Sequence, residues 1–198
     1  MLSLCIVPTY AQQETGTFTI QPKLGFNIAN ITDGYNMQGM QKKPIYGFAA
    51  GLEAEYLFSE RLGISFGALY SMQGAKARTS IDGIGVIETF KGAYINIPLM
   101  AKIYFVKEFA FNLGIQPAFK ISDSYKVSAL GLNFGGDISD LGFDVGTFYF
   151  SIPLGFSIEI SQIVLDARYL IGISDIIRDS DEKHSVFQFT LGYKFKTK

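Results

Sequence analysis

The stretch Tyr94-Ile-Asn-Ile-Pro-Leu-Met-Ala-Lys-Ile-Tyr-Phe105 alternates between apolar residues and a mixed second set. The apolar positions are Ile95, Ile97, Leu99, Ala101, Ile103 and Phe105. A period of two is typical of a β-strand whose two faces meet different environments. The stretch is also long enough to cross a bilayer as a tilted strand, which takes about 9–11 residues.

Seven further segments repeat this alternation. They cover approximately residues 18–28, 46–58, 62–73, 109–121, 148–159, 163–174 and 187–195. The connections after the second, fourth and sixth segments are about three residues long, whereas the others run from about nine to over twenty. Short turns at one rim and long loops at the other are typical of an outer-membrane barrel with its short turns in the periplasm.

We therefore predict an all-β fold: an eight-stranded antiparallel up-and-down transmembrane β-barrel of OmpA/OmpX-like architecture, located in the cell outer membrane. Proline at positions 22, 98, 117 and 153 conflicts with central strands, because proline cannot donate a ladder hydrogen bond. The alternation nevertheless continues through each proline, so we expect the strands to continue as well.

Composition supports one membrane domain after a short leader. The chain has 198 residues with a formal net charge of −1, so it carries no basic footprint for nucleic acid. Residues 1–11 resemble the remnant of a signal peptide with a small-x-small cleavage site at Thr9-Tyr-Ala11, which leaves residues 12–198 as the barrel domain. Cleavage there would remove Cys5, the only cysteine; a lipoprotein signal with Cys5 as the lipidated residue is the alternative.

The two rows of each strand predict which face meets lipid. An eight-stranded barrel is only wide enough for side chains to fill it, so eight rows of Phe, Leu and Ile would overfill the interior. We therefore place those rows in lipid and the small and charged residues inside. The predicted interior charge network comprises Lys23, Glu53, Glu55, Lys102, Glu159, Asp166, Arg168 and Lys194 near the periplasmic ends, with Lys120 further along its strand. Because isolated buried charges are costly, we expect a salt-bridged plug; a proton or substrate path is the alternative.

Several short motifs resemble the PorT-like family of outer-membrane β-barrels. They are Gly51-Leu-Glu-Ala-Glu-Tyr56, Leu69-Tyr-Ser-Met-Gln-Gly74, Tyr94-Ile-Asn-Ile-Pro-Leu99 followed by Lys102, and the pair Gly114 and Gln116. The resemblance covers nearly the whole mature chain and implies an outer-membrane location in Gram-negative bacteria. It implies no catalytic residues, and it connects the chain with protein secretion only through the member that gave the family its name.

Three groups of loop residues could carry chemistry. His184 lies near Ser174, Asp175, Ser185 and the run Asp179-Ser-Asp-Glu182, and such a grouping could serve hydrolysis or acyl transfer. Asp137 and Asp140 could offer oxygens to calcium, although the spacing matches no known ligand loop. Lys42-Lys43-Pro44, Lys76 and Arg78 could contact lipopolysaccharide phosphates. Ordinary solvated loops explain all three groups, and we expect no cofactor.

Two classes of function remain open. The first is a non-enzymatic, monomeric barrel with a charge-plugged, non-conducting interior, whose long extracellular loops bind a partner or serve assembly. Its expected partners are outer-membrane lipid, lipopolysaccharide and a protein bound through the extracellular loops. The second is a small barrel enzyme that acts on lipid or peptide at the outer rim, with an accessory role in secretion as a further alternative. A filled interior would favour the first class, and a lipid-reachable pocket near His184 the second.

Overall fold

The computed structural model describes residues 15–32, 41–81, 84–129, 132–136, 148–175 and 183–197. These residues form β-strands joined by turns. The strands are β1 (Phe18–Thr32), β2 (Gln41–Leu57), β3 (Leu62–Ile81), β4 (Ile84–Asn96), β5 (Leu99–Val106), β6 (Phe109–Ala129), β7 (Leu132–Gly136), β8 (Phe148–Ile160), β9 (Ile163–Asp175), β10 (Lys183–Tyr193) and β11 (Phe195–Thr197). Among the described residues, no helix is long and apolar enough to cross a membrane.

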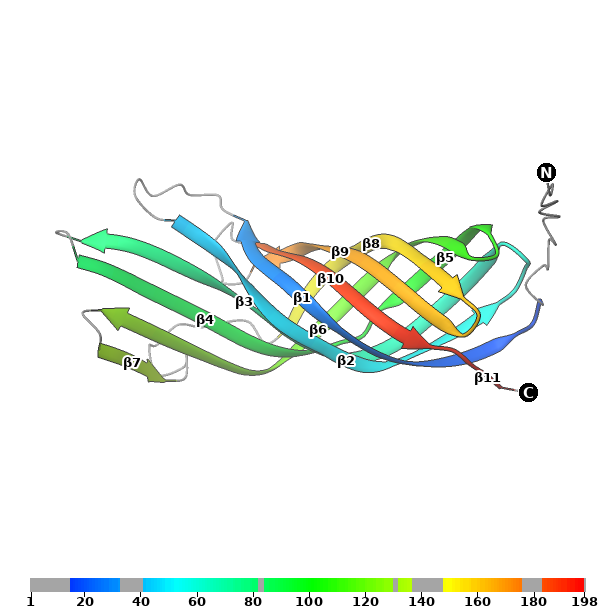
Figure 1. The fold of residues 1–198 in the computed structure, drawn as a ribbon, viewed down its shortest axis with the longest axis horizontal. Helices are drawn as coiled ribbons and strands as arrows, with labels where there is room; N and C mark the ends of the chain where they lie inside the picture. The colour runs from blue at the N-terminus through cyan, green and yellow to red at the C-terminus, as the bar shows by residue number, and fades with distance from the viewer. Residues whose placement is uncertain are drawn as a thin grey trace, which may run out of the picture.

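The strands form a closed barrel (Figure 1). Neighbouring strands pair antiparallel, and the pairing of β1 with β10 closes the ladder. β4 and β5 both pair with β3 and β6, so they are two parts of one wall strand; β10 and β11 likewise both pair with β1. The barrel therefore has eight wall strands, as predicted.

Pro98 interrupts one wall strand. It lies with Ile97 between β4 and β5, where its missing N–H removes a ladder hydrogen bond. The wall stays connected because Ile97 N donates to Pro117 O at 2.8 Å and Gly67 N donates to Pro98 O at 3.0 Å. The prediction of a continuous strand is therefore wrong at Pro98, although the alternation of buried and exposed faces continues through it. Pro22, Pro117 and Pro153 lie inside strands, as expected.

Parts of the connections that we predicted as long loops are strands instead. β3 and β4 remain paired up to Ile81 and Ile84, and β6 continues to Ala129 before β7 returns beside it. These strands project beyond the rest of the barrel wall (Figure 1). We call the projecting five-stranded sheet the sheet extension; it consists of residues 41–44, 74–81, 84–93, 122–129 and 132–136. Residues 33–40, 137–147 and 176–182 lie outside the described part of the chain.

The two ends of the barrel differ. The turns at residues 58–61, 107–108 and 161–162 lie at the same end as the start of β1 and the end of β11 (Figure 1). We call this the turn end, and the opposite end, which carries the sheet extension, the extended end. Because the connections at the turn end are short, the described residues at this rim belong almost entirely to the barrel wall and its turns.

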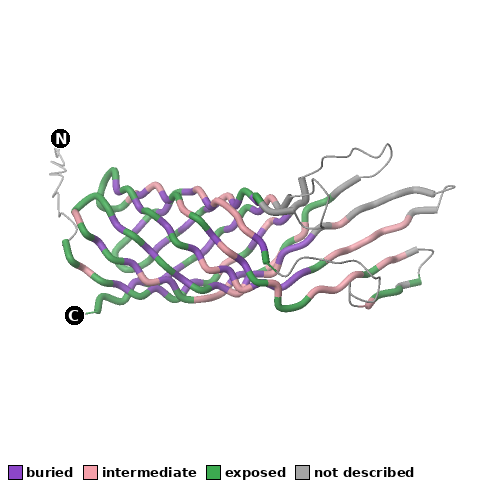
Figure 2. Tube along the Cα trace, turned by 180° about the vertical axis from the view of Figure 1, so that it is seen from behind, coloured by how far each residue is buried: buried purple, intermediate pink, exposed green. Residues whose placement is uncertain are grey.

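Along the wall, exposed and buried residues alternate (Figure 2). Leu24 is 68% exposed and Phe66 is 56% exposed, whereas Lys23 is 1% exposed and Met100 is fully buried. Inward glycines let the strands approach closely: a Cβ on Gly51 would lie 2.1 Å from the carbonyl oxygen of Ala68. The barrel is therefore apolar outside and polar inside, the arrangement that lipid requires of a membrane-spanning barrel.

Candidate functional site

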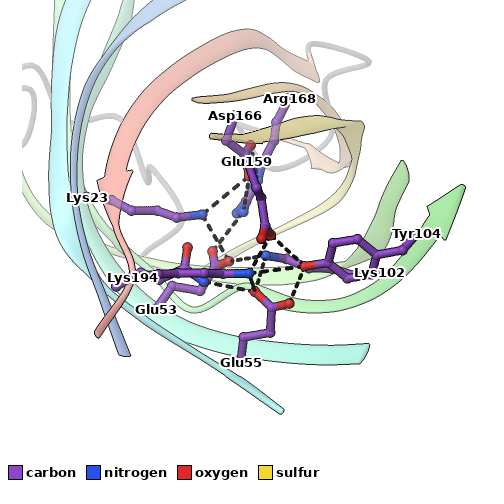
Figure 3. Close-up of polar contacts among 10 residues, drawn as sticks. Lys23, Glu53, Glu55, Lys102, Tyr104, Glu159, Asp166, Arg168 and Lys194 are labelled. Atoms are coloured by element: carbon purple, nitrogen blue, oxygen red, sulfur yellow. Dashed lines mark hydrogen bonds and ion pairs between the residues drawn. The ribbon is translucent and has the colours of Figure 1, made fainter. Parts of the chain in front are cut away.

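The most unusual feature of the interior is a cluster of ionised side chains near the turn end (Figure 3). The side chains of this cluster come from inward-facing positions of their strands, and residues two apart along one strand share a face. The spacing therefore brings Glu53 and Glu55 of β2 to the same face, and likewise Asp166 and Arg168 of β9. The eight ionised members are Lys23, Glu53, Glu55, Lys102, Glu159, Asp166, Arg168 and Lys194, and we call them the charge network.

One half of the charge network is organised around Glu53 and Arg168. Arg168 Nη2 lies 2.8 Å from Glu53 Oε2, and Lys23 Nζ lies 2.9 Å from Glu53 Oε1. Asp166 completes this half: Arg168 Nε donates to its Oδ1 at 2.7 Å, and Lys23 Nζ lies 3.3 Å from its Oδ2. Two cations and two carboxylates thus share one set of contacts that joins β1, β2 and β9.

The other half is organised around Glu55 and Tyr104. Lys102 Nζ donates to Glu55 Oε2 at 2.7 Å, and Lys194 Nζ lies 3.1 Å from the same oxygen. The hydroxyl of Tyr104 contacts Glu55 and lies 2.6 Å from Glu159 Oε1. Because a phenol carries one proton, Tyr104 donates to only one of these carboxylates at a time.

Three further contacts hold the charge network together. Lys194 forms an ion pair with Glu159, and its Nζ donates to the hydroxyl oxygen of Tyr104 at 3.2 Å. Lys102 bridges the two halves, because its Nζ also lies 3.5 Å from Glu53 Oε1. The side chains of Lys23, Glu53 and Lys102 are fully buried.

The charge network is electrically balanced. Its cations are Lys23, Lys102, Arg168 and Lys194, and its anions are Glu53, Glu55, Glu159 and Asp166. Ions taken out of water lose several kcal/mol of solvation each, which good pairing geometry recovers only in part. A neutral, fully paired set is therefore the arrangement in which these charges can remain buried. What it can do chemically is fill and cross-link the interior, since every carboxylate already has cationic partners.

The structure brings all eight sequence-predicted residues together. Lys120, the ninth interior charge considered, lies apart from them and pairs with Asp123. The nearest carboxylate to Lys102 is Glu55, with Nζ 2.7 Å from Oε2, and Glu53 is second, with Nζ 3.5 Å from Oε1. Sequence reasoning missed Tyr104, although its place two residues after Lys102 in the same inward row could have indicated it.

A neutral polar layer lies on the side of the charge network toward the extended end. Asn27 Nδ2 donates to Ser71 Oγ at 2.8 Å, and Gln188 Nε2 donates to Asn27 Oδ1 at 3.0 Å. Gln73 Nε2 also donates to Ser71 Oγ, at 3.0 Å. This layer adds cross-links between strands without adding charge.

A small cavity of about 20 Å³ lies beside this layer. Its lining includes Gln73, Tyr94, Asn96, Gln116, Tyr149 and Ser151. Asn96 is 1% exposed, and neither atom of its side-chain amide has a hydrogen-bond partner. A cavity of this size has room for about one water molecule.

The other candidate sites receive less support. Ser185 is the one member of the proposed Ser–His–Asp grouping whose side chain the structure describes, and its Oγ lies 2.6 Å from the hydroxyl of Tyr169. Asp137, Asp140, the run 179–182, Cys5 and the predicted leader 1–11 lie outside the described residues. Within the described ranges, no group of three or more His, Cys, Asp or Glu side chains could hold a metal ion.

A closed eight-stranded barrel with an apolar exterior and a polar interior is an outer-membrane β-barrel protein. Sequence comparison agrees: the profile of the family described as "Outer membrane protein beta-barrel domain" matches residues 10–178, and the chain belongs to this family. The prediction of a small outer-membrane barrel family and of an outer-membrane location is thus confirmed. No curated protein matches the sequence.

Two solved structures share the fold. The attachment invasion locus protein Ail of Yersinia pestis is 16% identical, with a TM-score of 0.51; the match covers 92% of this chain and 100% of Ail. Neisserial surface protein A is 15% identical, also with a TM-score of 0.51, and the match covers 90% of this chain and 97% of that protein. At such identities the likeness concerns the fold alone.

Proposed function

We propose that this protein is a non-enzymatic, non-conducting outer-membrane barrel that anchors a binding surface outside the cell. The observation that carries the proposal is the charge network, in which four cations and four carboxylates from both sides of the barrel contact one another. An ion entering this region would have to break paired, buried contacts. The interior therefore acts as a rigid plug and supports the wall.

The direction of the barrel follows from its two rims. Outer-membrane barrels have short periplasmic turns and longer extracellular connections. On that rule the turn end faces the periplasm, and the sheet extension stands outside the cell. The extension and the neighbouring connections are then the parts available to lipopolysaccharide or to a protein partner, with the barrel acting as a monomeric anchor.

The PorT-like motifs support a narrower family placement. Gln73, Asn96 and Gln116 belong to three different motifs, and all three line the same small cavity. A shared site for three sequence motifs is a reason to group this chain with PorT-like barrels. An accessory role in secretion is the second candidate function, and this motif cluster is the one observation that favours it.

An enzymatic role at the outer rim gains no support from the described residues. The cavity accommodates about one water molecule, and its lining combines amides and hydroxyls with aromatic rings and the aliphatic side chains of Ala118, Leu170 and Val186. Ser185 is bonded to Tyr169. These features fit a structural interior better than a lipid-cleaving site.

Electrical recording in planar bilayers tests the proposal. The purified full chain, inserted from detergent, is expected to give no steady channels at moderate voltage. A matched variant, Glu53→Ala combined with Arg168→Ala, removes one cation and one anion from the centre of the plug and is expected to conduct at least intermittently. Large, stable channels from the native protein would contradict the proposal.

A further inference from the structure

Lysines form a row across the sheet extension. Lys43 of β2 pairs with Lys76 of β3, Lys76 pairs with Thr89 of β4, and Thr89 pairs with Lys126 of β6. Directly opposed residues of antiparallel strands lie on the same face. Lys91, two residues from Thr89 in β4, shares this face as well. We call Lys43, Lys76, Lys91 and Lys126 the lysine row.

The lysine row lies on the outward face of the sheet. Met72 belongs to the outward row of β3, whereas its neighbour Ser71 is fully buried in the interior. Lys76 is four residues beyond Met72 in the same row of β3. Lys91 of β4 pairs with Gly74, which lies midway between Met72 and Lys76 in β3. At about 3.3 Å per residue and a tilt of about 40°, Lys91 lies about 5 Å and Lys76 about 10 Å beyond Met72 along the barrel axis. This is the height of lipid headgroups above an apolar band that ends near Met72.

No described carboxylate balances these lysines. The extension contains two described carboxylates, Glu88 and Asp123, and both lie on the opposite face, because Glu88 pairs with Ala77 and Asp123 pairs with Gly92. Asp123 is already bound to Lys120. Lys43, Lys91 and Lys126 are exposed.

The position of Lys43 makes the uncompensated positive charge more unfavourable. It lies directly opposite Lys76, and like charges in directly opposed positions destabilise a sheet. An anion placed between them would remove this cost. The lysine row therefore combines positive charge, headgroup height and an unfavourable lysine pair on one surface.

We propose that the lysine row binds the phosphate groups of glycolipids in the outer leaflet. The inference rests on the proposed function and deepens it, because it names the partner of the outward face of the extension. A membrane lipid fits better than a soluble anion, since the row continues the lipid-facing surface at the height where phosphates lie. Each lysine close to an anionic lipid surface contributes about fivefold to binding, so three of them contribute about 100-fold.

Lipid binding in nanodiscs tests this inference. The full chain in phosphatidylcholine nanodiscs is titrated with fluorescent lipid A carrying both sugar phosphates, and separately with the same lipid after removal of the phosphates. The test variant is Lys76→Gln/Lys91→Gln/Lys126→Gln. The matched control, Arg61→Gln/Lys107→Gln/Lys196→Gln, removes the same charge from exposed residues at the turn end. A third arm uses the soluble phosphorylated disaccharide without acyl chains.

The native protein and the control are expected to prefer phosphorylated lipid A, and the test variant to lose about 100-fold in affinity for it. Raised salt is expected to weaken native binding. Should the triple variant fold poorly, Lys91→Gln and Lys126→Gln are measured singly, with a loss of about fivefold expected for each. Equal binding of the two lipids, or an equal loss in the control, would overturn the inference.

Two further results separate the possibilities. If the soluble disaccharide binds as tightly as the lipid, the row recognises a water-soluble polyanion and the lipid assignment is wrong. The triple variant is expected to remain silent in planar bilayers, because the lysine row is not part of the plug. Channels from the native protein would contradict the closed interior while leaving the lipid result intact.

Discussion

Arg168 and Glu53 form an ion pair across the interior: Arg168 Nη2 lies 2.8 Å from Glu53 Oε2, although β10 and β1 separate their strands in the wall. The contact thus joins two parts of the barrel that share no ladder hydrogen bonds. Cross-links of this type make the stability of the wall depend on side chains that never meet lipid.

Removing Glu53 should be costly. Glu53→Ala leaves Arg168 and Lys23 buried without their common acceptor, and breaking a buried pair by deleting one partner costs about 3–5 kcal/mol. Urea unfolding of the protein in lipid vesicles measures the loss. Because the chain contains no tryptophan, unfolding is followed by tyrosine fluorescence or by gel mobility. Glu60→Ala, on the exposed turn after β2, is the control and should leave the unfolding midpoint unchanged. Equal midpoints for Glu53→Ala and the native protein would show that the pair contributes nothing.

Lys102→Ala should be rescued selectively. The substitution deprives Glu55 of its 2.7 Å partner, so adding Glu55→Gln should recover most of the lost free energy of unfolding. Adding Glu159→Gln should recover little, because Glu159 is held by Tyr104 and Lys194. Double-mutant cycles on unfolding in vesicles distinguish the two combinations. Equal rescue by both would mean that the charge network responds only to net charge.

A charged substitution on the lipid face should destabilise the barrel by a different mechanism. Leu99, 40% exposed and outward, precedes fully buried Met100. Leu99→Arg should cost about 2–4 kcal/mol near the middle of the membrane, and Glu55→Gln should not rescue it. Single cysteines replacing Ile97, Leu99 and Ala101 should react with lipid-soluble probes, whereas one replacing Lys102 should not. The reverse labelling pattern would indicate a ligand-carrying barrel with an apolar lumen.

Asn96 offers a test of the cavity. Neither atom of its buried amide has a protein partner, whereas Asn27 donates to Ser71 Oγ at 2.8 Å and Met72 O at 2.9 Å. Asn96→Leu should therefore be close to neutral or stabilising, and Asn27→Leu should cost about 1–3 kcal/mol because it leaves buried partners unsatisfied. Thermal unfolding in detergent compares them. A large loss from Asn96→Leu would show that the cavity contains a bound group that the amide holds.

The wall of the barrel could be predicted from sequence because every wall strand has to meet the same requirement of the lipid. Each strand must show lipid an apolar row, and rows such as Leu62 to Met72 make the period of two visible. Beyond Met72 the apolar row of β3 ends, and residues 74–81 look like a loop in the sequence. The sheet extension was missed for this reason.

The interior could be predicted in composition but not in pairing. Charge and period showed that Lys102 and Glu55 point inward, yet which carboxylate meets which cation depends on the relative shift of strands around the closed ladder. That shift brings Arg168 to Glu53 across two intervening strands. Likewise, Tyr104 is an ordinary inward residue in the sequence and becomes a bridge only because Glu55 and Glu159 converge on it.

The pairing of β1 with β10 has a consequence for biogenesis. Lys23 comes from the first wall strand and Lys194 from the end of the last, so each half of the charge network needs a residue from one of the two strands that close the barrel. Until the first and last strands meet, Glu55 and Glu159 lack the ammonium group that Lys194 supplies. We expect a partly inserted chain to carry uncompensated charge and to resist entry into the bilayer, so that ring closure and neutralisation occur in a single concerted step. Insertion would then be all-or-none, and incomplete barrels would remain accessible to periplasmic quality control.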